Sequence, residues 1–353
     1  MTKQRLSNFE QLRIICILLI LTMHSMAQVN YTYLSPANVY LSHVVSSVGN
    51  IGVSCFILIS GYFGVKFKLH RFLQLVLLTT FYTVLVHLFQ NGFVFDRSLI
   101  KALLVIPLYD NWFITCYLLL MFFAPYLNKF VIELTKLQYI KLLAVSVVFF
   151  CVLPTALNTP WYTVLFGGGK CLTYVIFLYM VGRFLRLHAD INIKRSKILL
   201  AFCLFQTLIL VGNIGMEHLL HKPCRVLALD CSPFILGSAI CVFYMFKTFC
   251  LYSKTINNIS SSVLAVFLLD GLRQWMNNYI HIEKYATSYG LAIALLALVF
   301  LTFVFSVIID KVRILLLGKV ENRLLDYSSN KILRLKNFTL RKIENKCDDN
   351  FND

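Results

Sequence analysis

Glu10, Arg13, His24, His87, Asp270 and Arg273 are ionisable residues in or beside long apolar segments of the sequence. A charged side chain at the centre of a membrane-spanning helix costs at least about 2.5 kcal/mol on insertion scales. Each of these residues therefore marks an interior-facing position unless a neighbour satisfies it. Arginine can bind a phosphate group through two parallel hydrogen bonds, and a neutral histidine can take up a proton. These residue types point to binding of an anionic group and to general-base chemistry.

Arg13 and His24 lie eleven positions apart in one apolar segment. At about 100° per residue, a helix brings their side chains to within about 20° of one face and separates them by about 16 Å along its axis. Such a stripe can hold an anionic donor at one end and perform base chemistry at the other. In the alternative interpretation, Arg13 reaches lipid phosphates and His24 caps the opposite end of the helix. The spacing fits both.

Asp270 and Arg273 lie three residues apart in a late apolar segment. An i, i+3 ion pair would satisfy both charges without any tertiary contact, so it is the simpler interpretation. In the alternative, the carboxylate of Asp270 orients an imidazole such as that of His24 and stabilises its protonated form. His87 has no evident partner, and we expect it to be packed and hydrogen-bonded rather than catalytic.

Two further patterns are weak. His218 and His221 have a His-any-any-His spacing, but no second cluster accompanies it, so we predict no metal site. Most of the eleven cysteines lie in apolar runs, where they are expected to pack as small apolar residues. Cys224 and Cys231 share one loop, and we predict no disulfide between them.

Membrane-spanning helices must position these side chains, because the composition is far more apolar than that of a soluble chain. Of 353 residues, 59% are hydrophobic and 14% are charged, and the mean hydropathy is +0.74. A helix needs about 20 mostly apolar residues to cross a bilayer. We predict an all-α, polytopic membrane helical bundle of about ten transmembrane helices, at residues 11–29, 43–63, 70–91, 112–130, 139–156, 170–187, 198–216, 232–251, 258–278 and 288–316.

Lysine and arginine residues gather in the C-terminal segment and in those connections that share a side with the N-terminus. Cytoplasmic loops are enriched in these residues, so we predict cytoplasmic termini and a multi-pass protein of the cell (inner) membrane. Residues 1–316 form the predicted transmembrane domain. Residues 317–353 form a basic cytoplasmic tail, which either lies on the anionic membrane lipid or is a solvated flank. This distribution accounts for the net charge of +17, so no nucleic-acid partner is expected.

Several short motifs occur in a fixed order along the chain. They are NFEQLR at 8–13 followed by His24-Ser25, CFILISGYF at 55–63, KLHR at 68–71, Asn111-Trp112-Phe113-Ile114 with Tyr117 and Pro125, and a serine run at 260–262 leading to Phe267-Leu268-Leu269. Together they resemble the membrane acyltransferase family 3 over about residues 8–310. The chain departs from that family at Lys68, where the family has arginine, and at Asp270, where it usually has histidine.

The resemblance implies transfer of an acetyl or other short acyl group from cytoplasmic acyl-CoA to a hydroxyl of a cell-surface glycan or lipid-linked sugar. By this resemblance, Arg13, Lys68 and Arg71 would engage the phosphates of CoA. His24 would be the general base, and Asp270 its candidate partner. The implied co-substrate is acetyl-CoA or another short acyl-CoA. The resemblance implies no metal, and it is compatible with either a monomer or a homo-oligomer.

Aromatic residues near these motifs have two possible roles. Tyr62, Trp112 and Tyr117 either line the path of a substrate or belong to the aromatic belt that forms at membrane interfaces. The competing function is a transporter or flippase of a glycan or small anion, which would also place arginine and histidine on one interior face. Such transporters often carry inverted repeats, and the sequence has no internal repeat.

Overall fold

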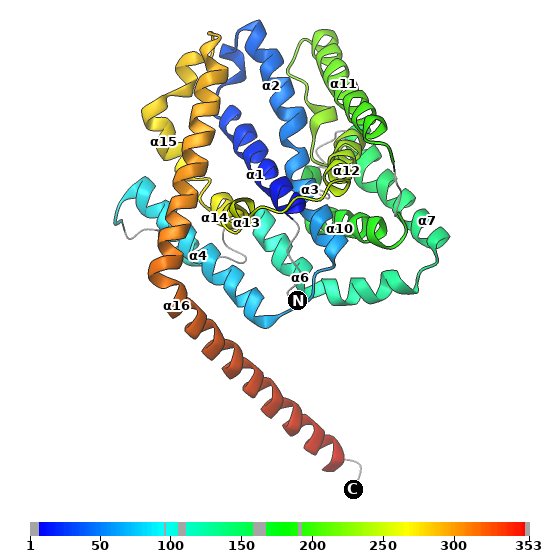
Figure 1. Ribbon diagram of the computed structural model, residues 1–353, viewed down its shortest axis with the longest axis vertical. Helices are drawn as coiled ribbons and strands as arrows, with labels where there is room; N and C mark the ends of the chain where they lie inside the picture. The colour runs from blue at the N-terminus through cyan, green and yellow to red at the C-terminus, as the bar shows by residue number, and fades with distance from the viewer. Residues whose placement is uncertain (1–6, 95–96, 105–110, 158–166, 190–192, 350–353) are drawn as a thin grey trace.

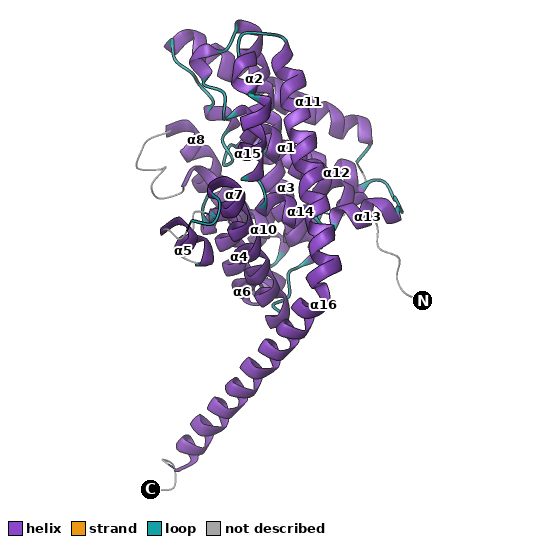
Figure 2. Ribbon diagram, turned by 90° about the vertical axis from the view of Figure 1, so that its left-hand side faces the viewer, coloured by secondary structure: helices purple, strands orange, loops and turns teal. Residues whose placement is uncertain are grey.

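The computed structural model describes residues 7–94, 97–104, 111–157, 167–189 and 193–349. These residues form helices and loops and contain no strand, which confirms the predicted all-α class (Figures 1 and 2). The α-helices are α1 (Asn8–Met26), α2 (Pro36–Gly49), α3 (Ile51–Phe63), α4 (Leu69–Asn91), α5 (Arg97–Leu103), α6 (Trp112–Glu133), α7 (Lys136–Val147), α8 (Leu153–Leu157), α10 (Leu172–Leu187), α11 (Arg195–Leu220), α12 (Pro233–Lys247), α13 (Lys254–Ser260), α14 (Val263–Leu268), α15 (Leu272–Ile280) and α16 (Gly290–Asp349).

The number of spans differs from the sequence-based prediction. Eight helices in the described chain are long and apolar enough to cross a membrane, or nine if the bent pair of α13–α14 and α15 is one span. The predicted span at 170–187 corresponds to α10, which has 16 residues and is therefore about 24 Å long, shorter than the roughly 30 Å hydrocarbon core. Ten spans are thus not confirmed, while the multi-pass character is clear.

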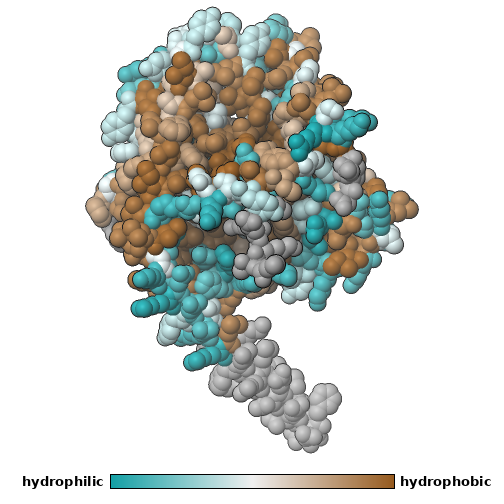
Figure 3. Space-filling view, in the orientation of Figure 1, coloured by the Kyte–Doolittle hydropathy of each residue, from teal (hydrophilic) through white to brown (hydrophobic). Residues whose placement is uncertain are grey.

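Apolar side chains cover much of the surface of the bundle (Figure 3). Exposed leucine and phenylalanine residues include Leu200 and Leu204 on α11 and Phe300 on α16, which are 71%, 58% and 64% exposed. Hydrophilic side chains gather towards the end of the bundle from which α16 projects (Figure 3). A surface of this kind is satisfied by lipid rather than by water.

Helix α1 runs through the middle of the bundle, where α2, α3, α12, α13, α14 and α16 contact it (Figure 1). Its contact with α3 is close because Gly52 has no side chain. A Cβ atom at Gly52 would lie 2.8 Å from the backbone oxygen of Cys16. Small residues let helix backbones approach in this way when no water is available to drive association. Helix α1 is thereby fixed along the length that separates Arg13 from His24.

A sharp break interrupts the segment that the sequence predicts as one span at 258–278. Helices α13–α14 and α15 are bent by 83° relative to each other. Asp270 lies in this break, where turn-type hydrogen bonds link Leu272 N to Leu269 O at 2.9 Å and Arg273 N to Asp270 O at 3.0 Å. Broken helices at membrane depth are tolerated where they line a cavity or are buried in protein.

Helix α16 has 60 residues and is therefore about 90 Å long. Its C-terminal half projects from the bundle (Figures 1 and 2). Lys311 donates to Asn258 O at 2.7 Å, which places it beside α13, and Ser260 of α13 contacts Glu10 of α1. The start of α1 and the projecting part of α16 therefore lie at the same end of the bundle. The boundary predicted at residue 316 lies inside this continuous helix.

Candidate functional site

His24 and Asp270 meet at one end of the bundle, although 246 positions separate them in the sequence. His24 Nδ1 lies 3.0 Å from Asp270 Oδ2. Arg273 donates from Nε to Asp270 Oδ1 at 3.1 Å. Arg273 Nη2 also donates to Asp270 Oδ2, at 3.4 Å. The two contacts that the sequence offers as alternatives are therefore both present, and Oδ2 takes part in both.

The carboxylate of Asp270 defines how His24 can act. A carboxylate next to Nδ1 favours the tautomer that carries its proton there. Within the described residues, Nε2 of His24 has no hydrogen-bond partner. The lone pair of Nε2 is then available to a hydroxyl group, as general-base chemistry requires. Arg273 is 5% exposed and holds the carboxylate from the other side.

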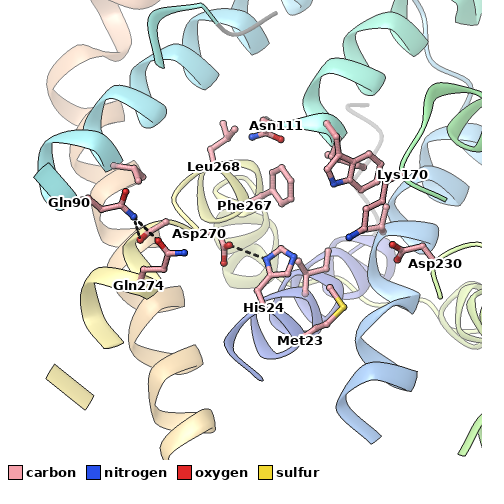
Figure 4. A pocket seen from close by; sticks show the side chains of 16 residues that line it. Met23, His24, Gln90, Asn111, Lys170, Asp230, Phe267, Leu268, Asp270 and Gln274 are labelled. Atoms are coloured by element: carbon pink, nitrogen blue, oxygen red, sulfur yellow. Dashed lines mark hydrogen bonds and ion pairs between the residues drawn. The ribbon is translucent and has the colours of Figure 1, made fainter. Parts of the chain in front are cut away.

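His24 opens into a cavity of about 390 Å³, which we call the His24 cavity. Its lining comes from α1, α3, α4, α6, α14, α15 with the break before it, and the segments around Lys170 and Asp230. His24 lies between Asp270 on one side and Lys170 and Asp230 on the other (Figure 4). Gln90 and Gln274 add amide groups to the lining. Cavities of about 300–1,000 Å³ with a few convergent polar groups are typical ligand sites.

Arg13 lines a second cavity of about 260 Å³, which we call the Arg13 cavity. The Arg13 guanidinium donates to Glu10 Oε1 at 2.7 Å. Ser260 Oγ donates to the other Glu10 oxygen, also at 2.7 Å. The Arg13 side chain is 29% exposed, and its remaining N–H groups contact no other polar group among the described residues. Donors are therefore available for an anionic ligand.

The two cavities adjoin inside the bundle. Ile20, Val53, Phe113 and Phe267 line both of them. Arg13 and His24 are on one helix, α1, as their spacing predicts. The shared wall is made only of apolar side chains. This arrangement suits a ligand that has a charged group at one end and reacts at the other.

The predicted aromatic residues are in three different environments. Trp112 lines the His24 cavity, and Tyr117 lines the Arg13 cavity. The Tyr117 hydroxyl lies 3.4 Å from Ser60 Oγ. Tyr62 lies outside both cavities, where its ring packs 5.1 Å from that of Phe243 and its hydroxyl accepts from Arg186 at 3.2 Å.

Lys68 and Arg71 lie at the start of α4, and both are exposed. Neither lines a described cavity. Leu75, which lines the Arg13 cavity, is four residues beyond Arg71 on the same helix. Residues four apart share one face of a helix. Arg71 is therefore one helical turn from the lining of the Arg13 cavity rather than part of it.

The remaining predicted histidines lie elsewhere. His87 lies 3.3 Å from Val94 O and 3.2 Å from Asn91 Nδ2, and lines neither cavity. His218 and His221 line a separate surface cavity between α2 and α11. No group of three or more histidine, cysteine, aspartate or glutamate residues in the described parts of the chain could hold a metal ion. Cys224 and Cys231 are both free.

Sequence analysis missed Asp230 and Lys170 in the His24 cavity. Asp230 is outside the spans predicted from the sequence, so the cost of placing a charge inside a membrane-spanning helix did not single it out. The signal for Lys170 was the run of three glycines that precedes it, Gly167–Gly169. Such a run often marks a close approach of two backbone segments.

Comparison with known proteins gives one match. A family model described as an acyltransferase domain, that of the acyltransferase 3 family, matches residues 6–311. It covers well over half of the chain, including both cavities. No curated protein and no solved structure matches the chain.

Proposed function

Because the chain belongs to the acyltransferase 3 family, we propose that this membrane acyltransferase is an O-acyltransferase that uses a short acyl-CoA, most simply acetyl-CoA. The acceptor is a hydroxyl group of a cell-surface glycan or lipid-linked sugar. The observation that carries this proposal is the pair of adjoining cavities on α1, one containing Arg13 and the other containing His24 with Asp270. In this proposal the Arg13 end faces the cytoplasm of a cell inner membrane.

The Arg13 cavity suits the donor. Arg13 has donors to spare for a phosphate oxygen, and charged hydrogen bonds of this kind are the strong ones. Lys68 and Arg71 add positive charge near the start of α4, although Lys68 lacks the planar fork of an arginine. The apolar wall formed by Phe113 and Phe267 suits the thin, uncharged arm that joins the CoA phosphates to the thioester.

The His24 cavity suits the chemistry. Nε2 of His24 takes the proton from the acceptor hydroxyl as its oxygen attacks the thioester carbonyl carbon. A carbon–oxygen bond forms, the carbon–sulfur bond breaks, and the proton passes from His24 to the departing thiolate. Asp270 keeps the imidazole in the required tautomer and stabilises its protonated form, while Arg273 fixes the carboxylate.

The test is the O-acetyl content of cell-surface glycans, measured by mass spectrometry in cells that express the wild type or a variant at equal membrane levels. His24→Ala is expected to lower the acetyl content at least about 100-fold, because a positioned general base contributes about 10²–10⁴-fold. His218→Ala is the matched control, since His218 lines a different cavity. Equal acetyl content in wild-type, His24→Ala and empty cells would contradict the proposal and would favour transport.

A further inference from the structure

Asp230 is a largely buried carboxylate whose electrostatic partners are Lys170 and His24. The residue is 8% exposed and lines the His24 cavity. Its side-chain oxygens make no hydrogen bond or ion pair with any described residue; only its backbone oxygen is bonded. These oxygens are not among the fully buried side-chain atoms without a partner, so they are accessible from the cavity. A carboxylate that faces a cavity in this way is therefore suited to a ligand that donates hydrogen bonds.

The backbone around Asp230 is held firmly even though its side chain forms no hydrogen bond with a described residue. Tyr174 donates its hydroxyl hydrogen to Asp230 O at 2.7 Å. Gly169 packs directly against the same residue, and a Cβ atom there would lie 2.9 Å from Asp230 Cβ. Gly169 also has a φ of +96°, which favours glycine. The glycine run thus places the following residue, Lys170, beside Asp230.

Lys170 brings a positive charge to the same wall (Figure 4). It is exposed and forms no ion pair or hydrogen bond with a described residue. Asp230 and Lys170 therefore present an acceptor and a donor side by side, across His24 from Asp270 (Figure 4). An acceptor and a donor at neighbouring points match adjacent hydroxyl groups on a sugar ring, since each hydroxyl can both donate and accept.

The charges around the cavity are balanced. Asp230 and Asp270 are negative, while Lys170 and Arg273 are positive. A binding wall for an anionic sugar would need a surplus of positive charge to offset the loss of hydration. The remaining polar lining is neutral and consists of the amides of Gln90, Asn111 and Gln274. The cavity therefore favours an uncharged ligand rich in hydroxyl groups.

We propose that Asp230 and Lys170 recognise the acceptor as an uncharged sugar ring, and so present one of its hydroxyls to His24. The carboxylate of Asp230 accepts a hydrogen bond from a second hydroxyl, and the ammonium of Lys170 donates to a neighbouring oxygen. Neither residue exchanges a proton during acyl transfer. The inference rests on the proposed function and adds the residues that select its acceptor.

Two measurements on purified full-length protein test this inference separately from the acyl transfer. Saturation-transfer NMR would follow binding of methyl glucoside, galactoside, mannoside and rhamnoside, with methyl glucuronide and galacturonide as charged counterparts. Kinetics of acetyl transfer from acetyl-CoA to the glycosides that bind would then give the KM for each acceptor. Binding of CoA, by calorimetry, checks that each variant is intact at the donor end.

The variants are Asp230→Ala, Asp230→Asn and Lys170→Met. We expect Asp230→Ala to weaken glycoside binding about 30-fold and to raise the acceptor KM similarly, because a hydrogen bond to a charged group is lost. Asp230→Asn keeps one acceptor oxygen, so we expect a loss of about 10-fold, as for Lys170→Met. Glu283→Gln is the control, an exposed carboxylate at the same end that lines neither cavity. CoA binding should stay within about twofold throughout.

Each outcome decides one question. Four results would overturn the inference. Two concern Asp230→Ala: glycoside binding that is unchanged, or glycoside and CoA binding that weaken equally. Two concern the wild type: stronger binding of the uronides than of the uncharged glycosides, or no binding of any glycoside. Glycoside binding that depends on Asp230, in a wild type that transfers no acetyl group, would sustain the sugar site and overturn the acyltransferase proposal.

Discussion

The two ends of α1 hold ionisable side chains in different ways. At the Arg13 end, the charged contact is made within one turn of α1, between Arg13 and Glu10, and a serine of α13 completes it. At the His24 end, four charged residues come together from the segments around residues 170, 230 and 270. The cavity at the first end is mostly apolar, and the cavity at the second combines apolar side chains with a larger share of polar groups.

This contrast matches a division of labour. The proposed donor has one anionic end and a long uncharged part, which would suit a single arginine above an apolar passage. The proposed acceptor would have to be oriented so that one hydroxyl meets Nε2 of His24, and such orientation needs several polar contacts on a rigid backbone. Changes at the two ends should therefore affect different kinetic constants.

The largest effect that separates the two ends is expected from Asp270→Asn. The amide can offer its NH₂ group to Nδ1 of His24, which favours the tautomer with no lone pair at Nε2. We expect kcat for acetyl transfer to fall between about 10²- and 10⁴-fold, with CoA binding unchanged. Steady-state kinetics with acetyl-CoA and calorimetry with CoA provide the measurement. A kcat close to that of the wild type would leave Asp270 with only its ion pair to Arg273.

That prediction depends on the contact between His24 and Asp270, which the sequence alone could not establish. Helical spacing put Arg13 and His24 on one face of one helix, and the structure has both on α1. The contact between His24 and Asp270 joins positions 246 residues apart, and it depends on a break of 83° that local sequence does not reveal. Asp230 was missed because it lies between predicted spans, where no periodicity indicates burial. The sequence was sufficient to predict which residues share a helix, but not which residues meet through tertiary packing.

Arg13→Gln is expected to act on the donor alone. Loss of a charge-assisted hydrogen bond should raise the KM for acetyl-CoA by about 10- to 100-fold, while the KM for the acceptor changes little. Glu10 can still accept from Ser260, so the helix contact is retained. Lys136→Gln, at an exposed position at the start of α7, controls for general loss of charge.

Arg71→Gln should have a weaker effect than Arg13→Gln, and one that shrinks as salt is raised, because Arg71 is exposed. If Arg13→Gln left the KM for acetyl-CoA unchanged, Arg13 of the wild type would serve only as a partner of Glu10 at the membrane surface. The division between the two ends would then lose its donor side.

The smallest effects are expected from the aromatic residues of α6, which reach both cavities from one helix. Trp112→Phe removes an N–H donor from the His24 cavity, and Tyr117→Phe removes a hydroxyl from the Arg13 cavity. Each should change one KM by about two- to fivefold, that of the acceptor for Trp112 and that of acetyl-CoA for Tyr117. Tyr126→Phe is the control, because Tyr126 is on the same helix and is 66% exposed. A reversed pattern, with Trp112→Phe acting on the donor, would mean that the thioester enters from the His24 end and that the two cavities have exchanged roles.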